Sequence, residues 1–290
     1  MKSISKGISN CTTLLGLAFC LPMVVSGNEI LIDSSHTSDQ ITGAVGGTAL
    51  FYLDDVSQPT GTGVFDPFLT LNSNGNNSTG IKDTEQAYNT SGNVQGNKPP
   101  LDGFSGSGSR NTDLQLSQLQ SVMVNGASYF AFSLDANEPA NYPENRLSID
   151  NIRIYVSPTG GQTTLNPDSL GNLVFALNDP LSLVAPNGTT DGNANWVNLD
   201  AAYRGSGAAD LFVYIPTAAF LGVDPSSFVY FYNLDGIHES AQGGTGADAT
   251  FEEWSALKTA QSVPDGGITV LLLGTALASM GLLYGRRIQA

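Results

Sequence analysis

The chain has 290 residues, including 33 glycines, and its 26 acidic against 11 basic residues give a formal net charge of −15 at pH 7. Its two cysteines are Cys11 and Cys20, so the rest of the chain offers no disulfide, no thiolate nucleophile and no cysteine-bound zinc. The excess of negative charge disfavours nucleic acid and anionic lipid headgroups as partners.

The first 27 residues have the composition and order of a signal peptide. Lys2 and Lys6 form a basic start, Thr12–Val25 is apolar, and Val25-Ser26-Gly27 places short side chains where a signal peptidase cuts. We therefore expect residues 1–27 to be removed, so that the mature chain begins at Asn28.

Residues 28–257 are expected to form one all-β ectodomain, an antiparallel β-sandwich with jelly-roll-like connections. They are rich in Gly, Asn, Ser and Thr, which disfavours long helices and favours strands joined by turns. A segment of this length can bury a core without disulfides. Period-two alternation predicts strands at Thr48–Val56, Val64–Asn72, Leu114–Val124, Ser128–Asp135, Arg146–Val156, Leu173–Leu177, Trp196–Tyr203, Asp210–Ile215 and Phe228–Leu234.

Local signals refine two of these strands. Asn125-Gly126 is the preferred pair for a type I′ turn, so the strands on either side of it should form a hairpin with Phe130, Phe132 and Leu134 facing inward. In Arg146–Val156 the apolar positions change parity, which predicts a β-bulge at Asp150-Asn151.

Three further segments are interpreted by their composition. Leu211–Ile215 is apolar on both faces and should be a central strand, with Phe228–Tyr232 as its neighbour. Phe251–Leu257 is the one plausible helical turn. Residues 72–111 are dense in Asn, Gly and Ser and predict long loops or a partly disordered insertion. The sequons at Asn76, Asn77, Asn89 and Asn187 would mark surface loops if they were glycosylated, but chance occurrence is the commoner explanation in a chain so rich in Asn and Thr.

Oxygen-bearing side chains gather after one predicted strand. Asp135, Asn137 and Glu138 could bind calcium together with Asp150 from the bulge, because calcium prefers carboxylate and carbonyl oxygens. The spacing is not that of an EF-hand. The alternative is a structural turn in which these side chains bond nearby backbone N–H groups. No other cofactor is indicated.

Other candidates for chemistry are open to structural explanations. Strand aromatics could stack on sugar rings but are more often core residues; those considered are Tyr155, Trp196, Tyr203, Tyr214, Tyr230 and Tyr232. His36 and His238 are expected to be exposed loop residues. We find no catalytic motif and predict no enzyme, although paired carboxylates for glycoside cleavage are assembled in space and leave no signature in sequence.

The carboxyl end holds a short motif, an apolar segment and a basic stop. After a polar spacer (258–262), Val263, Pro264, Asp265, Gly266 and Gly267 precede the uncharged run Ile268–Tyr284 and the pair Arg286 and Arg287. The run is long enough for a transmembrane helix (268–285) of roughly 25 Å. The arginines in the tail (286–290) should stay in the cytoplasm, which places the ectodomain outside.

This tail resembles the PEP-CTERM class of bacterial sorting signals, and is closest to its VPDSG-CTERM variant. Val263, Pro264, Asp265 and Gly267 match the variant, and Gly266 replaces its serine. The resemblance implies recognition by an exosortase, a membrane transpeptidase that removes the helix near the motif and passes the protein to the cell surface or extracellular matrix. It covers about a tenth of the chain.

The ectodomain is similar to a group of bacterial exported proteins with the same kind of tail. The likeness rests on the blocks Gln58–Phe68, Ala87–Thr90, Phe132–Pro139, Leu147–Tyr155 and Gly205–Pro216. It implies one integrated domain and transfers no catalytic residue. The leading hypothesis is a non-enzymatic surface or matrix protein. A carbohydrate-binding module that recognises exopolysaccharide, with or without the help of calcium, is the first alternative, and a polysaccharide-active enzyme is the second.

Overall fold

The computed structural model describes residues 29–53, 66–72, 84–104, 110–139, 141–142, 144–178, 194–201, 208–238, 246–247 and 251–259. The predicted signal peptide (1–27), sorting motif (263–267), transmembrane helix (268–285) and basic tail (286–290) lie outside these residues. Within the described ranges, no helix combines the length and the apolar character needed to cross a membrane.

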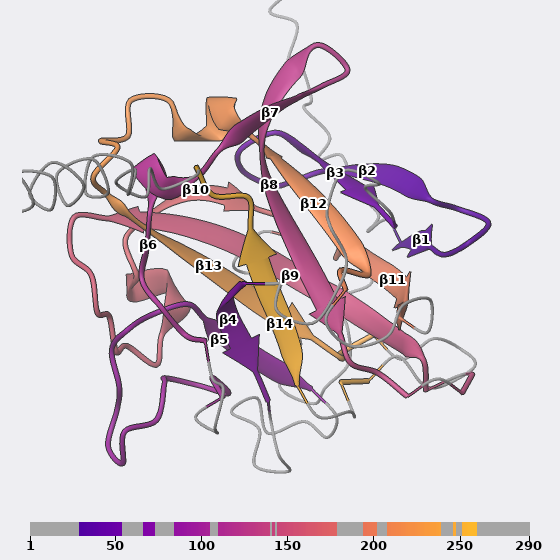
Figure 1. Cartoon of the computed structure of the whole chain (residues 1–290), viewed down its shortest axis with the longest axis horizontal. Helices are drawn as coiled ribbons and strands as arrows, with labels where there is room; N and C mark the ends of the chain where they lie inside the picture. The colour runs from indigo at the N-terminus through magenta and orange to yellow at the C-terminus, as the bar shows by residue number, and fades with distance from the viewer. Residues whose placement is uncertain are drawn as a thin grey trace, which may run out of the picture.

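The described chain is all-β, as predicted, with two sheets packed face to face (Figure 1). The first sheet has the order β1 (Glu29–Ile32), β11 (Trp196–Asp200), β9 (Arg146–Ser157), β13 (Phe228–Asp235) and β5 (Glu85–Tyr88), with β10 (Asn172–Ala176) beside β9 and β6 (Leu114–Gln115) beside β13. Its pairs are antiparallel except for β1 and β11, which run parallel.

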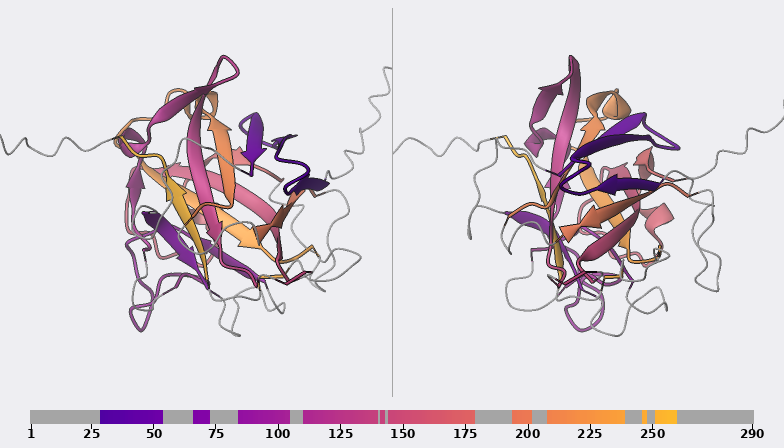
Figure 2. Two further views of the ribbon diagram at one scale, coloured as in Figure 1. Left: turned by 45° about the vertical axis from the view of Figure 1, so that its right-hand side comes forward. Right: turned by 90° about the vertical axis from the view of Figure 1, so that its right-hand side faces the viewer.

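The second sheet is antiparallel throughout its described strands. It has the order β2 (Ser38–Thr42), β3 (Thr48–Tyr52), β12 (Leu211–Pro216), β8 (Ala127–Ala136), β14 (Glu252–Ala256) and β4 (Pro67–Leu71), with β7 (Ser121–Val124) beside β8. The hairpin of β7 and the start of β8 projects from one end of the body (Figure 2). Short 3-10 turns lie at Leu116–Gln118, Pro167–Ser169 and Thr217–Phe220.

Aromatic side chains hold the two inner faces together. Phe231 from the first sheet lies 4.7 Å from Trp254 and 4.9 Å from Phe132 of the second sheet, between ring centroids. Phe68 packs edge-on against Phe231 at 5.8 Å. All four rings are at most 1% exposed. Burial of this much apolar surface is the main stabilisation of a body whose described residues include no cysteine.

The first sheet is also covered on its outer face. Tyr88, Tyr155, Tyr230 and Tyr232 are buried there, beneath residues 158–171. The hydroxyl of Tyr230 donates a hydrogen bond to the carbonyl of Thr159 at 2.8 Å, and Tyr88 donates to Thr164 at 2.8 Å. The tyrosine hydroxyls therefore fasten this covering segment to the sheet.

The predicted local features of β7, β8 and β9 are confirmed. Val124 pairs with Ala127 across a two-residue turn, and both Asn125 (φ 50°) and Gly126 (φ 82°) have the positive φ of a type I′ turn. Phe132 and Leu134 face the core with Phe130 packed beside them. In β9, Asn151 pairs with Leu234 and Ile149 with Asp235, so Asp150 is the extra residue of the bulge.

Four sequence-based assignments differ from the structure. Phe228–Tyr232 belongs to β13 in the first sheet, so it is not a neighbour of the central strand β12. Phe251–Leu257 contains strand β14 rather than a helical turn, because its backbone pairs with β8 and β4 while its alternating side chains Glu252, Trp254 and Ala256 are buried. Leu114–Val124 divides into β6 and β7, and the expected loop 72–111 contains β5.

Asn89 shows why that segment is ordered. It directly follows β5 and is completely buried. Its Nδ2 donates to the carbonyl of Val229 at 3.0 Å, and its Oδ1 accepts from the N–H of Phe231 at 2.6 Å. The side-chain amide thus takes the place of the next peptide group of β5 beside β13. Because the Asn89 side chain is buried, it is not the surface position that a glycosylated sequon would require.

Candidate functional site

A polar face lies on the outer side of the first sheet where β1, β9 and β11 meet. Strand alternation turns Leu147, Ile149, Val197 and Leu199 toward the core, which leaves their neighbours on the outer side. These neighbours are Arg146, Ser148, Trp196, Asn198 and Asp200. The register places Asn198 beside Ser148 and Asp200 beside Arg146.

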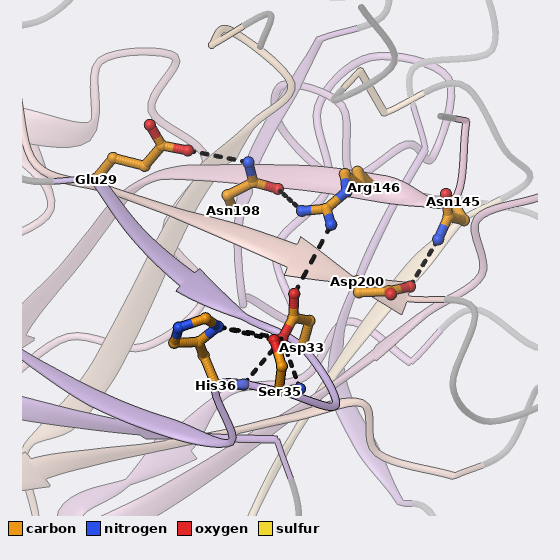
Figure 3. Close-up of polar contacts among 8 residues, drawn as sticks. All are labelled: Glu29, Asp33, Ser35, His36, Asn145, Arg146, Asn198 and Asp200. Carbon is orange, nitrogen blue, oxygen red and sulfur yellow. Dashed lines mark hydrogen bonds and ion pairs between the residues drawn. The ribbon is translucent and has the colours of Figure 1, made fainter. Parts of the chain in front are cut away.

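Arg146 is the centre of this face (Figure 3). Its Nη1 donates to Oδ1 of Asn198 at 2.9 Å, and its Nη2 lies 3.9 Å from Oδ2 of Asp33. Asn198 in turn donates from Nδ2 to Oε1 of Glu29 at 3.0 Å. Parallel pairing of β1 with β11 brings Glu29 to Asn198, although they are far apart in sequence.

The turn after β1 fixes the carboxylate that faces Arg146. Oδ1 of Asp33 accepts hydrogen bonds from the N–H of Ser35 at 2.7 Å and the N–H of His36 at 2.9 Å. Partial burial on its own raises the pKa of Asp33, but the bonds from Ser35 and His36 outweigh it and hold this pKa below 3.8. Asp33 is therefore ionised at neutral pH. The His36 side chain is 64% exposed, as expected for a loop residue.

An exposed aromatic ring borders this network. The guanidinium carbon of Arg146 lies 5.7 Å from the ring centre of Tyr142, which is 58% exposed. Nearby, Asn145 donates from Nδ2 to Oδ1 of Asp200 at 2.7 Å (Figure 3). An open ring beside planar amide, carboxylate and guanidinium groups is an arrangement that can hold a neutral, hydroxyl-rich ligand.

His238 lies on the same outer face and is not the exposed loop residue that the sequence predicts. Its side chain is only 12% exposed. The imidazole stacks flat on the indole of Trp196, with 4.6 Å between centroids, and its Nδ1 lies 2.5 Å from Oδ1 of Asp150. No local sequence signal joins these residues, because β9, β11 and the end of β13 bring them together.

The bulge at Asp150 positions its carboxylate for the contact with His238 and for bonds to the chain near it. Oδ2 of Asp150 accepts from Oγ of Ser148 at 3.0 Å and from the N–H of Ile237 at 2.7 Å. Its oxygens are therefore used to fix the chain that follows β13. This is the role that the turn alternative assigns to such residues.

The other predicted calcium ligands lie elsewhere. Asp135 is on the outer face of the second sheet beside Glu253, and Asn137 donates from Nδ2 to the carbonyl of Phe251 at 3.0 Å. Glu138 follows in the same segment, whereas Asp150 belongs to the first sheet. In the described part of the chain, no three His, Cys, Asp or Glu side chains are grouped to hold a metal ion. Calcium binding by this set stays a prediction.

A second polar group, missed by the sequence analysis, lies inside the sandwich. Glu85 and Asp235 pair across β5 and β13 and face the core, and Glu252 faces them from β14. These three side chains are at most 2% exposed. Burial, together with the Glu252 and Asp235 charges, raises the pKa of Glu85 well above 4.5. Burial, together with the Glu252 and Asp150 charges, also raises the pKa of Asp235 well above 3.8.

The aromatics considered for sugar stacking are core residues where the structure describes them. Tyr203 lies outside the described residues. The exposed fractions of the others are 2% for Tyr155, 8% for Trp196, 6% for Tyr214, 0% for Tyr230 and 2% for Tyr232. The exposed ring is instead Tyr142, which stands in a turn and which strand periodicity does not single out.

No family model, no curated protein and no solved structure matches this chain. The function is therefore inferred from the chain's own residues.

Proposed function

We propose that this chain is the precursor of an exported cell-surface or extracellular-matrix protein of non-enzymatic, structural or interaction type. In this proposal a signal peptidase removes residues 1–27, and an exosortase-type transpeptidase recognises Val263–Gly267 and releases the protein from the helix 268–285. The observation that carries the proposal is the order of motif, uncharged run and arginine pair.

The features of the described domain are compatible with an exported protein. Its described residues form an all-β unit without cysteine, and three of its basic side chains, Arg146, Arg153 and Lys258, are paired with carboxylates. Its last described residue, Thr259, is hydrogen-bonded to Gln118 a few residues before Val263. The proposal also includes two features of the architecture, namely jelly-roll-like connections between the strands and a transmembrane helix at residues 268–285.

The sorting proposal is tested by fractionating cells that express the full chain with a tag inserted after residue 27. We expect an external protease to reach the tag when the outer layer is permeabilised. We also expect Pro264→Ala with Asp265→Ala to leave the protein in the membrane fraction, while Asp39→Asn, an exposed change on β2, is sorted as the wild type. A wild-type chain found in the cytosol would contradict the proposal.

Carbohydrate binding is the second candidate, and the face around Tyr142 favours it. An exposed ring can stack on a sugar, and the neighbouring Arg146, Asn145 and Asp200 can exchange hydrogen bonds with its hydroxyls. Because the face is built from side chains that already bond one another, it is held in place before any ligand arrives. Calcium would assist only if the ligands predicted at Asp135 came together.

An array of exopolysaccharides separates the remaining alternatives. Binding that is lost in Tyr142→Ala, but kept in Met123→Ala, which truncates another exposed side chain, would identify Tyr142 as the sugar platform. Loss of binding on adding a chelator would support calcium assistance. Release of soluble products would instead identify a polysaccharide-active enzyme. Wild-type protein that binds none of the glycans would contradict the second candidate.

A further inference from the structure

Strand β7 is paired on one side only within the described part of the chain. Its partner is β8, and no other described strand pairs with it. β14 lies on the same side of β8, but its last paired residue, Ala256, is opposite Phe132 and therefore stops before the stretch of β8 that β7 covers. The second edge of β7, along Ser121–Val124, thus borders no described strand.

The register of the hairpin determines which backbone groups of β7 face outward. Val124 and Ala127 close the two-residue turn as a pair that exchanges two hydrogen bonds, and such pairs alternate along an antiparallel ladder. Val122 therefore also bonds β8. The N–H and C=O groups of Ser121 and Met123 point away from β8, toward the open edge.

This open edge carries no charge. The segment Leu114–Leu134 contains no charged residue and no proline, although the whole chain has a formal net charge of −15. The Met123 side chain is 68% exposed, and Ser121 is exposed beside it. Natural proteins usually protect an exposed edge strand with a charge, a proline or a covering segment.

The outermost strands of the two sheets show such protection. On β5, the carbonyl of Gln86 accepts from the N–H of Asp102 at 3.0 Å, and on β4 the carbonyl of Thr70 accepts from the N–H of Phe104 at 2.9 Å. β1 and β2 each include an acidic residue. Because β7 has neither feature, its edge is open to another strand.

We propose that β7 pairs antiparallel with β7 of a second copy of this chain, across a twofold axis at Val122. In this register Ser121 lies opposite Met123 of the second copy, and Met123 lies opposite its Ser121. Each outward N–H group then meets an outward C=O group of the other copy, as in the hydrogen-bonded pairs of an antiparallel ladder. The second sheets of the two copies become one continuous sheet.

Charge and shape favour a second copy as the partner. Two copies with a net charge of −15 repel each other over most of their surface. The uncharged β7–β8 hairpin projects from one end of the body (Figure 2), so two copies can meet there while their bodies stay apart. Identical strands are also self-complementary under a twofold axis. A strand with a charged side chain opposite Met123 would lose hydration without gaining an ionic partner.

The contact should be weak and depend on protein concentration. A strand of four residues buries less surface than the roughly 1,200 Å² of a stable interface. Holding many copies on one surface or in one matrix raises their local concentration and favours the pairing. The pairing rests on strand geometry and not on the sorting proposal, so either can fail while the other holds.

The first test is disulfide cross-linking of the purified full chain in detergent. Cys11→Ser and Cys20→Ser remove its own thiols, and Val122→Cys places a new one at the twofold axis. The Cα atoms of a non-hydrogen-bonded antiparallel pair are about 4.5 Å apart, a distance that a disulfide can bridge. Under mild oxidation, Val122→Cys should give roughly tenfold more dimer than Asn93→Cys, an exposed position in the segment after β5. Equal yields at every protein concentration would overturn the proposal.

The second test separates backbone pairing from contact between exposed side chains. The N–H of Met123 faces the open edge, so Met123→Pro removes no bond to β8 and is tolerated there. In the Val122→Cys chain this change should lower the yield of dimer roughly tenfold, because each copy loses one backbone donor. Met123→Ala keeps the N–H and should leave the yield nearly unchanged. A larger loss with alanine than with proline would show that side chains meet and that the strands do not pair.

The third test uses the wild-type chain and needs no variant to fold. Raising the protein concentration should slow amide hydrogen exchange at Ser121 and Met123, whose N–H groups face solvent in a single copy. Exchange at Val122 and Val124 should not change, because these groups already bond β8. Exchange that stays fast at Ser121 and Met123 at every concentration would refute the pairing. Slowing only after addition of phosphatidylcholine vesicles would also refute it, and would assign the edge to a membrane surface.

Discussion

At the residue scale, asparagine side chains replace missing peptide groups at the edges of the sheets. Asn89 does so beside β13. Asn111 does so beside β4, where its Oδ1 accepts from the N–H of Thr70 at 3.1 Å and its Nδ2 donates to the carbonyl of Thr70 at 3.2 Å. Asn178 likewise donates to the carbonyl of Asp150 at 2.8 Å. A chain rich in asparagine can thus satisfy backbone groups that its short strands leave unpaired.

Replacing Asn89 with alanine should be strongly destabilising. The change leaves the buried N–H of Phe231 and the carbonyl of Val229 without the partner that Asn89 supplies. We expect a loss of about 2–4 kcal/mol in the free energy of unfolding, measured by urea denaturation. The matched control Asn93→Ala changes an exposed residue of the same segment and should cost less than about 0.5 kcal/mol. Equal losses in both variants would disprove this role for Asn89.

At the element scale, the pattern of side chains predicted most strands and not their partners. Nine segments of alternating or apolar residues lie wholly or partly on observed strands, because one side of each faces the core. β14 was missed because Glu252, whose side chain is buried, interrupts its apolar positions. β5 was missed because its glutamate and glutamine hide the buried Ala87 and Tyr88.

The polar face could not be predicted from any one element. Arg146 and Asn198 come from two strands and Asp33 from the turn after a third, and the parallel pairing of β1 with β11 that brings them together has no local signature. The bulge at Asp150 was predictable from parity, but the contact of Asp150 with His238 and the stacking of His238 on Trp196 were not. Sequence periodicity reports which side of a strand is buried, and leaves open which strands share an edge.

The tyrosines beneath residues 158–171 predict how the protein unfolds in alkali. Burial raises the pKa of Tyr230 to about 12 and raises the pKa values of Tyr88 and Tyr232 further. Because each folded pKa lies above the unfolded value near 10, the stability that these tyrosines contribute is complete below pH 10 and is lost as the pH rises beyond it. Absorbance of the ionised phenols and loss of circular dichroism should therefore change together.

Tyr230→Phe provides the variant for this titration. It removes one buried ionisable group and its bond to Thr159, so the alkaline transition should become less steep while stability at pH 7 falls by about 1 kcal/mol. Tyr142→Phe changes an exposed ring and should leave the steepness unaltered. If the absorbance of all tyrosines rose before any loss of circular dichroism, the hydroxyls would ionise in the folded protein. That result would contradict their protection from solvent by the covering segment.

At the scale of the whole molecule, both sheets draw strands from the whole length of the described chain. The first sheet joins β1 with β11 and β13, and the second joins β2 with β14. Because strands of the two sheets alternate along the sequence, no single segment of the chain forms one sheet alone. We therefore expect the body to unfold as a single cooperative unit. The many pairings between distant segments also predict slow folding.

The position of β14 makes the end of the body a sharp boundary. β14 pairs with β8 on one side and β4 on the other, and its Trp254 packs against Phe231 of the opposite sheet. A chain ending at residue 250 would leave both neighbours unpaired and the core without its tryptophan. We expect residues 28–250 to give no cooperative thermal transition by circular dichroism, whereas residues 28–262 give one.

The same pair of truncations bears on release at the predicted motif. A cut near Val263 falls just after Thr259, whose N–H donates to the carbonyl of Gln118 at 2.8 Å, and so removes none of the contacts described for β14. Residues 28–262 should therefore have the midpoint of the full chain in detergent, within about 2 °C. A midpoint much lower than this would mean that the segment beyond residue 262 stabilises the body, and that release there would weaken the delivered protein.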